Sequence, residues 1–368
     1  MPGRGWHHVP VRTSQLDQSG RNRGVGLGIA LVSALAFGGS GVAAKPLIEA
    51  GLDPLHVVWL RVAGAALLML PLAWRHRDLL RRRPALLAGF GLLAVAGVQA
   101  FYFASISRIP VGVALLVEYL GPALLLGYVR FVQRRPVTRA AAVGVVLAVG
   151  GLACVVEIWS GLSFDALGLL LAFGAACCQA CYFLLSDQGS DAGADAPDPL
   201  GVIAFGLLIG AAVLTVVSRP WGMDWSVLAG TADMNGVPVA AYLLLGWVVL
   251  IATVLAYMTG VLSVRRLSPQ VAGVVACLEA VVATVLAWVL LGEALSTPQI
   301  IGGLVVVVGA FIAQSATPVK GSAEPVAAGG GVATTAAVAA DAAAGEAPVG
   351  AVSSVAPEGD SAARSGSD

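Results

Sequence analysis

The chain has 368 residues, of which 58% are hydrophobic and 11% are charged, and its formal net charge is zero. Soluble domains carry charge on roughly a quarter of their residues, so this chain has too few charges to cover a water-exposed surface. A net charge of zero also provides no basic field for polyanions, which argues against a nucleic-acid partner. The composition therefore indicates a multi-pass membrane protein.

Ten apolar segments are candidates to cross a membrane. A bilayer core about 30 Å thick requires about 20 apolar residues in a helix. By that measure the spans run approximately over residues 25–44, 54–74, 85–106, 109–131, 140–156, 166–185, 200–217, 239–262, 269–291 and 298–316. Nine spans are the alternative, because the connection between the third and the fourth is very short. We therefore expect an all-α integral membrane protein.

The remaining segments divide the chain into four parts. Residues 1–24 form a predicted cytoplasmic N-terminal tail, and residues 25–157 and 165–316 form two five-helix units. Residues 317–368 are rich in Ala, Gly, Ser and Pro, so they cannot bury enough apolar surface to fold alone and are predicted to be a disordered cytoplasmic tail. With the N-terminus inside, most Lys and Arg residues lie on the cytoplasmic side, which predicts a cytoplasmic-membrane protein with both termini inside.

The two five-helix units share sequence features. The tripeptide Asp-Pro-Leu opens the second span at positions 53–55 and the seventh span at positions 198–200. Glu118 lies midway along the fourth span, and Glu279 lies midway along the ninth. An odd number of spans in each unit gives the units opposite orientations. The sequence therefore predicts ten transmembrane helices in two inverted five-helix repeats, an architecture typical of alternating-access carriers with a substrate site at the midplane.

Three ionisable residues lie deep within predicted spans: Arg61, Glu118 and Glu279. A charge at that depth costs a few kcal/mol on insertion scales, so each residue needs a function or a partner. Arg61 either reaches back to the outer headgroups or acts as a buried cation that binds an anionic group or pairs with Glu118. Each glutamate either binds a ligand or is a protonated group that fixes helix packing.

A helix break is predicted directly after Glu118. The ring of Pro122 clashes with the carbonyl four residues back, which is that of Glu118, and Gly121 leaves room for a ligand. Broken helices at membrane depth are tolerated where they are buried in protein or line a cavity. This segment is the main candidate for a binding site.

Polar residues at helical spacing predict a polar seam through the apolar bundle. Gln99 and Tyr102 lie three residues apart, as do Gln179 and Tyr182, while Tyr257 lies four residues after a threonine. The candidate residues for substrate binding or proton coupling are Glu118, Arg61, Gln99, Tyr102, Tyr119, Gln179, Tyr182, Tyr257 and Glu279, with Gly121 and Pro122 as the helix break.

The sequence lacks the motifs of nucleotide-driven pumps, zinc hydrolases and acyl transferases. We therefore expect no enzyme activity, no catalytic residues and no cofactor. Cys177, Cys178 and Cys181 resemble half of a metal knuckle, but no second Cys/His cluster completes four ligands, so no metal site is expected.

Several segments carry a family resemblance. Residues 113–122 are similar to a Glu-aromatic-x-Gly-Pro segment, and residues 134–136 and 181–186 match neighbouring parts of the same pattern. Residues 292–295 resemble a Gly-Glu-x-Leu turn that precedes a glycine-rich last helix. On these motifs residues 25–316 resemble the EamA-type carriers of the drug/metabolite transporter superfamily, nearest the threonine/homoserine exporter branch. The chain departs from that pattern at Glu279, where many members have Glu-Pro, and in lacking a Gly-Glu turn in its first half.

The residues and the resemblance together imply a secondary active transporter that exports small polar metabolites, amino acids or related compounds, driven by protons. Glu118 would bind either a proton or the substrate's amino group. The alternative is a non-transporting membrane sensor or assembly partner that acts through the acidic loop and the C-terminal tail. The expected partners are a small-molecule substrate, membrane lipids and protons, and a homodimer is compatible with the sequence.

Overall fold

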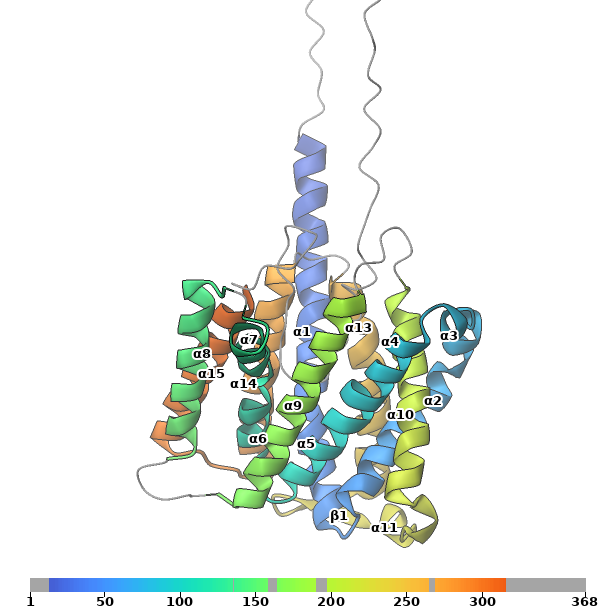
Figure 1. Cartoon of the computed structure of the whole chain (residues 1–368). Coiled ribbons are helices and arrows are strands. Elements are labelled where there is room, and N and C mark those ends of the chain that lie inside the picture. Colours follow the sequence, from blue (N-terminus) through green and yellow to red (C-terminus); the bar gives the residue numbers. More distant parts are fainter. Residues whose placement is uncertain (1–12, 135, 158–163, 190–196, 265–268, 316–368) are drawn as a thin grey trace, which may run out of the picture.

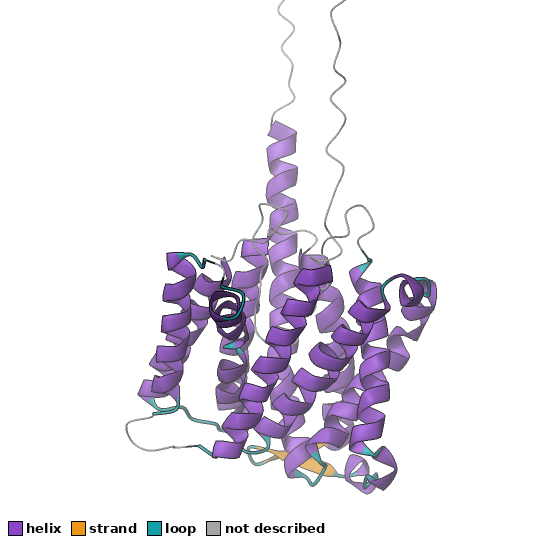
Figure 2. Cartoon of the chain, viewed as in Figure 1, coloured by secondary structure: helices purple, strands orange, loops and turns teal. Residues whose placement is uncertain are grey.

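The computed structural model describes residues 13–134, 136–157, 164–189, 197–264 and 269–315. This part of the chain is mostly helical (Figure 2), and its helices pack side by side as one bundle (Figure 1). Seven helical segments within it are long and apolar enough to cross a membrane. Three shorter apolar helices, Arg139–Val155, Leu278–Leu291 and Thr297–Ala313, coincide with the other predicted spans. The predicted tail over residues 317–368 lies outside the described residues.

The elements follow one another along the chain without long interruptions. The first half contains α1 (Thr13–Glu49), α2 (Pro54–Arg75), α3 (Leu79–Arg82), α4 (Pro84–Gly89), the π-helical segment η1 (Phe90–Gly97), α5 (Val98–Ile106), α6 (Val111–Glu118), α7 (Gly121–Phe131) and α8 (Arg139–Val155). The second half begins with α9 (Ala166–Gly189), α10 (Pro199–Ser218), a 3₁₀ turn η2 (Pro220–Gly222), α11 (Ser226–Ala229), β1 (Thr231–Met234) and β2 (Val237–Ala240). It continues with α12 (Ala241–Gly246), the π-helical segment η3 (Trp247–Leu255), α13 (Ala256–Val264), α14 (Pro269–Leu291) and α15 (Thr297–Ser315).

The first helix is longer than its apolar part. We expected a span from residue 25, but α1 begins at Thr13 and extends beyond the bundle (Figure 1). No proline interrupts the polar residues that precede the span, so the helix continues through them.

The repeated Asp-Pro-Leu tripeptide starts a helix in both halves. Asp53 accepts a hydrogen bond from the backbone N–H of Leu55 (2.8 Å), and Asp198 accepts one from Leu200 (2.9 Å). The following proline occupies the first helical position, where its missing N–H costs nothing. The same residues thus begin α2 and α10, the second membrane-spanning helix of each half.

A β-hairpin that the sequence analysis did not predict lies at the end of the bundle where α1 ends and α2 begins (Figures 1 and 2). Strands β1 and β2 pair in antiparallel register, with Thr231 opposite Ala240. Asn235 and Gly236 at the turn both have positive φ (55° and 83°), as a type I′ turn requires. We call this end of the bundle the hairpin end.

Packing between the halves follows a regular pattern. Segment η1 packs against α9 and α10, and η3 packs against α1 and α2. Helix α2 packs against α10, and α8 packs against α15. Glycines bring the backbones of α8 and α15 into contact: a Cβ on Gly151 would lie 2.7 Å from the carbonyl oxygen of Gly302. Such small residues are the usual means of close helix approach in lipid.

Candidate functional site

The centre of the candidate site is the guanidinium of Arg61 on α2. Its Nε donates to Thr253 Oγ1 (2.7 Å), its Nη1 donates to Gln99 Oε1 (2.7 Å), and its Nη2 donates to the carbonyl oxygen of Ala252 (3.2 Å). The guanidinium carbon lies 5.3 Å from the centroid of the Phe103 ring, within the range of a cation–π contact. Arg61 is only 1% exposed, so it turns into the bundle and does not reach back to the membrane surface.

The π-helical segment η3 supplies two of the oxygens that hold Arg61. The hydroxyl of Thr253 donates to the carbonyl oxygen of Val248 (2.7 Å), so its oxygen is oriented to accept from Arg61. Single π-helical turns are frequent at functional sites because they shift backbone carbonyls out of the α-helical register. Thr253 belongs to the predicted polar seam, one helical turn before Tyr257, but it was not among the candidate site residues, and the contact of Ala252 with Arg61 was not predicted.

The three oxygens that accept hydrogen bonds from Arg61 are all neutral. Glu118, Glu279, Tyr102 and Tyr257 lie close enough to act on its charge electrostatically. Both glutamates are almost fully buried (1% and 2% exposed). One buried cation and two buried acids from α6 and α14 therefore share the interior of the bundle.

The helix is interrupted directly beside Glu118. Helix α6 ends at Glu118, α7 begins at Gly121, and Tyr119 lies buried in the turn between them. A Cβ on Gly121 would lie 2.4 Å from Gln179 Oε1, so glycine lets this amide of α9 approach the break. Gln179 is fully buried, and neither of its amide atoms has a hydrogen-bond partner among the described residues.

The predicted tyrosines occupy different parts of the interior. The hydroxyl of Tyr102 lies against α1, where a Cβ on Gly41 would come within 2.4 Å of it. Tyr257 packs edge-on to Phe37, with ring centroids 5.2 Å apart. Tyr182 instead packs edge-on to Phe90 of η1. The structure thus brings Arg61, Gln99, Tyr102, Tyr257 and the two glutamates together, whereas Gln179 lies at the helix break and Tyr182 packs against η1.

A second charged contact lies at the hairpin end, and the sequence analysis did not predict it. Lys45 of α1 forms an ion pair with Glu293 of the connection between α14 and α15. The other carboxylate oxygen of Glu293 accepts from the backbone N–H of Val111 (2.9 Å), a donor at the start of α6 that has no partner within its own helix. The only signal in the sequence was the Gly-Glu-x-Leu turn, because the two charged residues are 248 positions apart.

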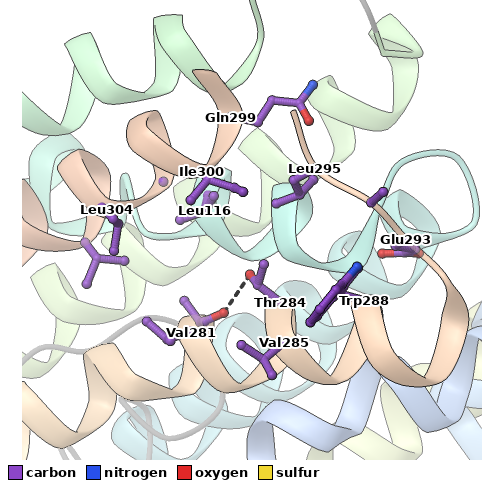
Figure 3. Close-up of a pocket in the computed structure, with 14 residues that line it drawn as sticks. Leu116, Val281, Thr284, Val285, Trp288, Glu293, Leu295, Gln299, Ile300 and Leu304 are labelled. Carbon is purple, nitrogen blue, oxygen red and sulfur yellow. Dashed lines mark hydrogen bonds between the residues drawn. The ribbon is translucent and has the colours of Figure 1, made fainter. Parts of the chain in front are cut away.

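A cavity of about 330 Å³ lies between α6, α14 and α15 (Figure 3). Its walls are mostly apolar, and its one internal hydrogen bond in Figure 3 joins the hydroxyl of Thr284 to the carbonyl of Ala280 (2.8 Å). Trp288 and Leu304, which line it, are 62% and 56% exposed, so the cavity opens at the surface of the bundle. The cavity is distinct from the polar cluster around Arg61, although Leu116 and Ala280 lie beside the two buried glutamates.

Known proteins match both halves of the chain. The model of the EamA-like transporter family matches residues 24–157 and again residues 166–314. The chain belongs to this family. The threonine/homoserine exporter RhtA of Escherichia coli (strain K12) is 30% identical over 294 residues, which cover 78% of this chain and 88% of that protein. RhtA of Salmonella typhimurium (strain LT2) is 31% identical over 252 residues, 67% of this chain and 76% of that protein. One solved crystal structure is 19% identical in sequence, with a TM-score of 0.49. The match covers 78% of this chain and 98% of the chain in that structure.

As a member of the EamA-like transporter family, the protein is a multi-pass membrane protein of a family that transports small molecules. The resemblance to this family and to its threonine/homoserine exporter branch, stated from the sequence motifs, is confirmed. The residues that bind substrate are a separate question, because family membership does not assign them.

Proposed function

We propose that this EamA-like transporter is a secondary active carrier that exports amino acids or closely related polar metabolites from the cytoplasm. The observation that carries the proposal is a buried guanidinium that donates hydrogen bonds to three neutral oxygens and lies within electrostatic reach of two buried glutamates. The names of the relatives support the same substrate class, since RhtA is a threonine/homoserine exporter.

The architecture we propose is ten transmembrane helices in two inverted five-helix repeats, with both termini in the cytoplasm. Its support is that equivalent helices meet one another: α2 packs on α10, α8 packs on α15, and η1 and η3 each pack on the first two helices of the other half. The start of α9 also lies beside Arg108, near the hairpin end, where α1 ends. Helices α1 and α9 would then run in opposite directions, as an inverted repeat requires.

Arg61 is suited to bind the carboxylate of an amino acid. A guanidinium has five N–H donors, and its three bonds to Thr253, Gln99 and Ala252 leave two of them for a ligand. The Phe103 ring covers one face of the guanidinium, so a ligand would approach the edge of the guanidinium. Arg binds carboxylates best in this edge-on geometry, through two parallel hydrogen bonds. The bonds to neutral oxygens hold the side chain in place without neutralising its charge.

Glu118 is suited to bind either the substrate's ammonium group or a proton. It lies at the end of α6, directly before the helix break, and it is buried in the same interior as Arg61. In the proposed cycle the ammonium group binds the ionised carboxylate on the cytoplasmic side. Protonation on the more acidic outer side then releases the substrate. Because the two ligands use the same carboxylate in turn, the proton gradient drives export.

Counterflow into reconstituted vesicles tests this function. Vesicles loaded with one unlabelled amino acid are mixed with its labelled form, and the set of amino acids is screened with and without a pH gradient. We expect exchange of small polar amino acids that a pH gradient accelerates. Exchange is expected to fall at least about tenfold in Arg61→Gln, because the site loses the permanent cation that would bind the substrate carboxylate. Failure of every amino acid to exchange, with the protein correctly inserted, would contradict the proposed substrate class.

A further inference from the structure

We propose that Glu293 is a positioning residue whose two contacts hold the hairpin end of the transporter closed. The inference rests on the proposed function, since a closure of this kind matters only to a carrier that opens alternately to each side. It concerns a residue outside the polar cluster. The lock, as we name it, consists of Lys45, Glu293 and the backbone N–H of Val111.

One carboxylate joins three elements of the lock. One oxygen of Glu293 pairs with Lys45, near the end of α1, and the other accepts from Val111, the first residue of α6. Both charged side chains are mostly shielded from water (16% and 11% exposed). Separating them therefore requires either water to enter the hairpin end or a new partner to be found, because an unpaired charge is costly in such surroundings.

The two helices that carry Lys45 and Val111, α1 and α6, both also reach the polar cluster around Arg61. Helix α6 begins at Val111, which Glu293 binds, and ends at Glu118. On α1, Gly41 lies one helical turn before Lys45 and packs against the hydroxyl of Tyr102. Glu293 also acts electrostatically on Tyr102. The contacts of Glu293 therefore reach α1 and α6, the two helices that border the cluster on its hairpin side, so a change at Glu293 is expected to affect the cluster.

The hairpin packs over the same connection. A Cβ on Gly292 would lie 2.9 Å from Oδ1 of Asn235 at the hairpin turn, and Gly292 has a positive φ of 68°. Strand β1 also contacts α1. The hairpin turn thus contacts the exposed residue beside Glu293, so the ion pair and the hairpin lie together at one end of the bundle.

Cysteine labelling tests the lock without measuring transport. Ser40 on α1 is 4% exposed, and its hydroxyl has no hydrogen-bond partner among the described residues, so Ser40→Cys is a conservative reporter. It lies five residues before Lys45, about 7.5 Å along the helix. In the full chain with its native cysteines replaced, a membrane-impermeant maleimide is applied to intact cells and to inside-out vesicles, and the labelling rate is measured.

We expect Glu293→Gln and Lys45→Met each to raise the labelling rate from the hairpin side about tenfold, the effect of about 1.4 kcal/mol in the opening equilibrium. The double variant should label no faster than either single one, because both remove the same contact. The control is Arg108→Gln, which breaks the exposed Arg108–Asp165 pair (3.2 Å) nearby and should leave the rate unchanged.

The outcomes separate the lock from the proposed function. Faster labelling in inside-out vesicles than in intact cells would reverse the proposed membrane orientation but support the lock. Faster labelling in a protein that exchanges no amino acid would likewise support the lock and contradict the proposed substrate. Unchanged labelling in both lock variants, or an equal increase in Arg108→Gln, would overturn the lock, whatever the transport result.

Discussion

The contact between α8 and α15 depends on glycine, and a single substitution can test it. A Cβ on Gly151 would lie 2.7 Å from both the carbonyl oxygen of Gly302 and the backbone nitrogen of Val306, whereas ordinary contact begins at 3.4 Å. Because these are backbone atoms, no side chain can turn away to make room. Gly151→Ala therefore forces the helices apart by 3.4 − 2.7 = 0.7 Å at this point.

The expected cost follows from overpacking. Extra methyl groups in a well-packed interior cost about 1–3 kcal/mol, and the better helix propensity of alanine returns less than about 1 kcal/mol of this. We therefore expect Gly151→Ala to lower the free energy of unfolding by about 1–2 kcal/mol. Gly150→Ala on the same helix is the matched control, since nothing lies within 4 Å of a Cβ there.

Thermal unfolding in detergent, followed as the fraction of protein that stays monodisperse, measures this difference. Gly151→Ala should unfold at a lower temperature than the parent protein, and Gly150→Ala should not. Equal unfolding temperatures for the two variants would show that α8 and α15 are not in backbone contact, and the packing of the two halves described above would then be wrong.

Three further outcomes are expected. Arg61→Lys keeps the charge but loses the planar fork that binds a carboxylate through two hydrogen bonds, so counterflow at low substrate concentration should fall by about tenfold and recover as the substrate concentration is raised. Gly121→Ala would place a Cβ 2.4 Å from Gln179 Oε1 and should reduce exchange, whereas Gly127→Ala on the same helix, with nothing within 4 Å, should not. Removal of the residues after Thr317 should leave the flux of the carrier intact; loss of bound partners with no flux in either form would favour the sensor alternative.

Much of the fold was predictable because apolar length and helix-start residues are local signals. The helical membrane class is confirmed. Asp53 and Asp198 each cap the N-terminus of a helix, a position where aspartate is preferred. Helix α6 ends at Glu118, four residues before Pro122, whose ring conflicts with the carbonyl of that glutamate. The hairpin was missed, although the Asn-Gly dipeptide at 235–236 is a strong turn signal, because its strands were assigned to a loop and to the start of a span.

The partners of the buried charges were not predictable from local sequence. The sequence left two environments open for Arg61, the membrane surface and the interior of the bundle. The structure places its guanidinium in the interior, against Ala252 and Thr253 of η3, which are 191 and 192 positions away. Likewise, the lock joins α1 to a residue 248 positions later. Contacts at such separations depend on how the two halves pack, and a single sequence carries no direct record of that packing.

Proton coupling through Glu118 is the claim on which the account depends most. Its direct test is amino-acid counterflow measured over a range of pH in vesicles that contain the parent protein, Glu118→Gln or Glu49→Gln, the last being an exposed glutamate at the end of α1. The account predicts that Glu49→Gln behaves as the parent protein does, while Glu118→Gln loses both the pH dependence and the acceleration by a pH gradient. Parental rates with an unchanged pH dependence in Glu118→Gln would contradict it.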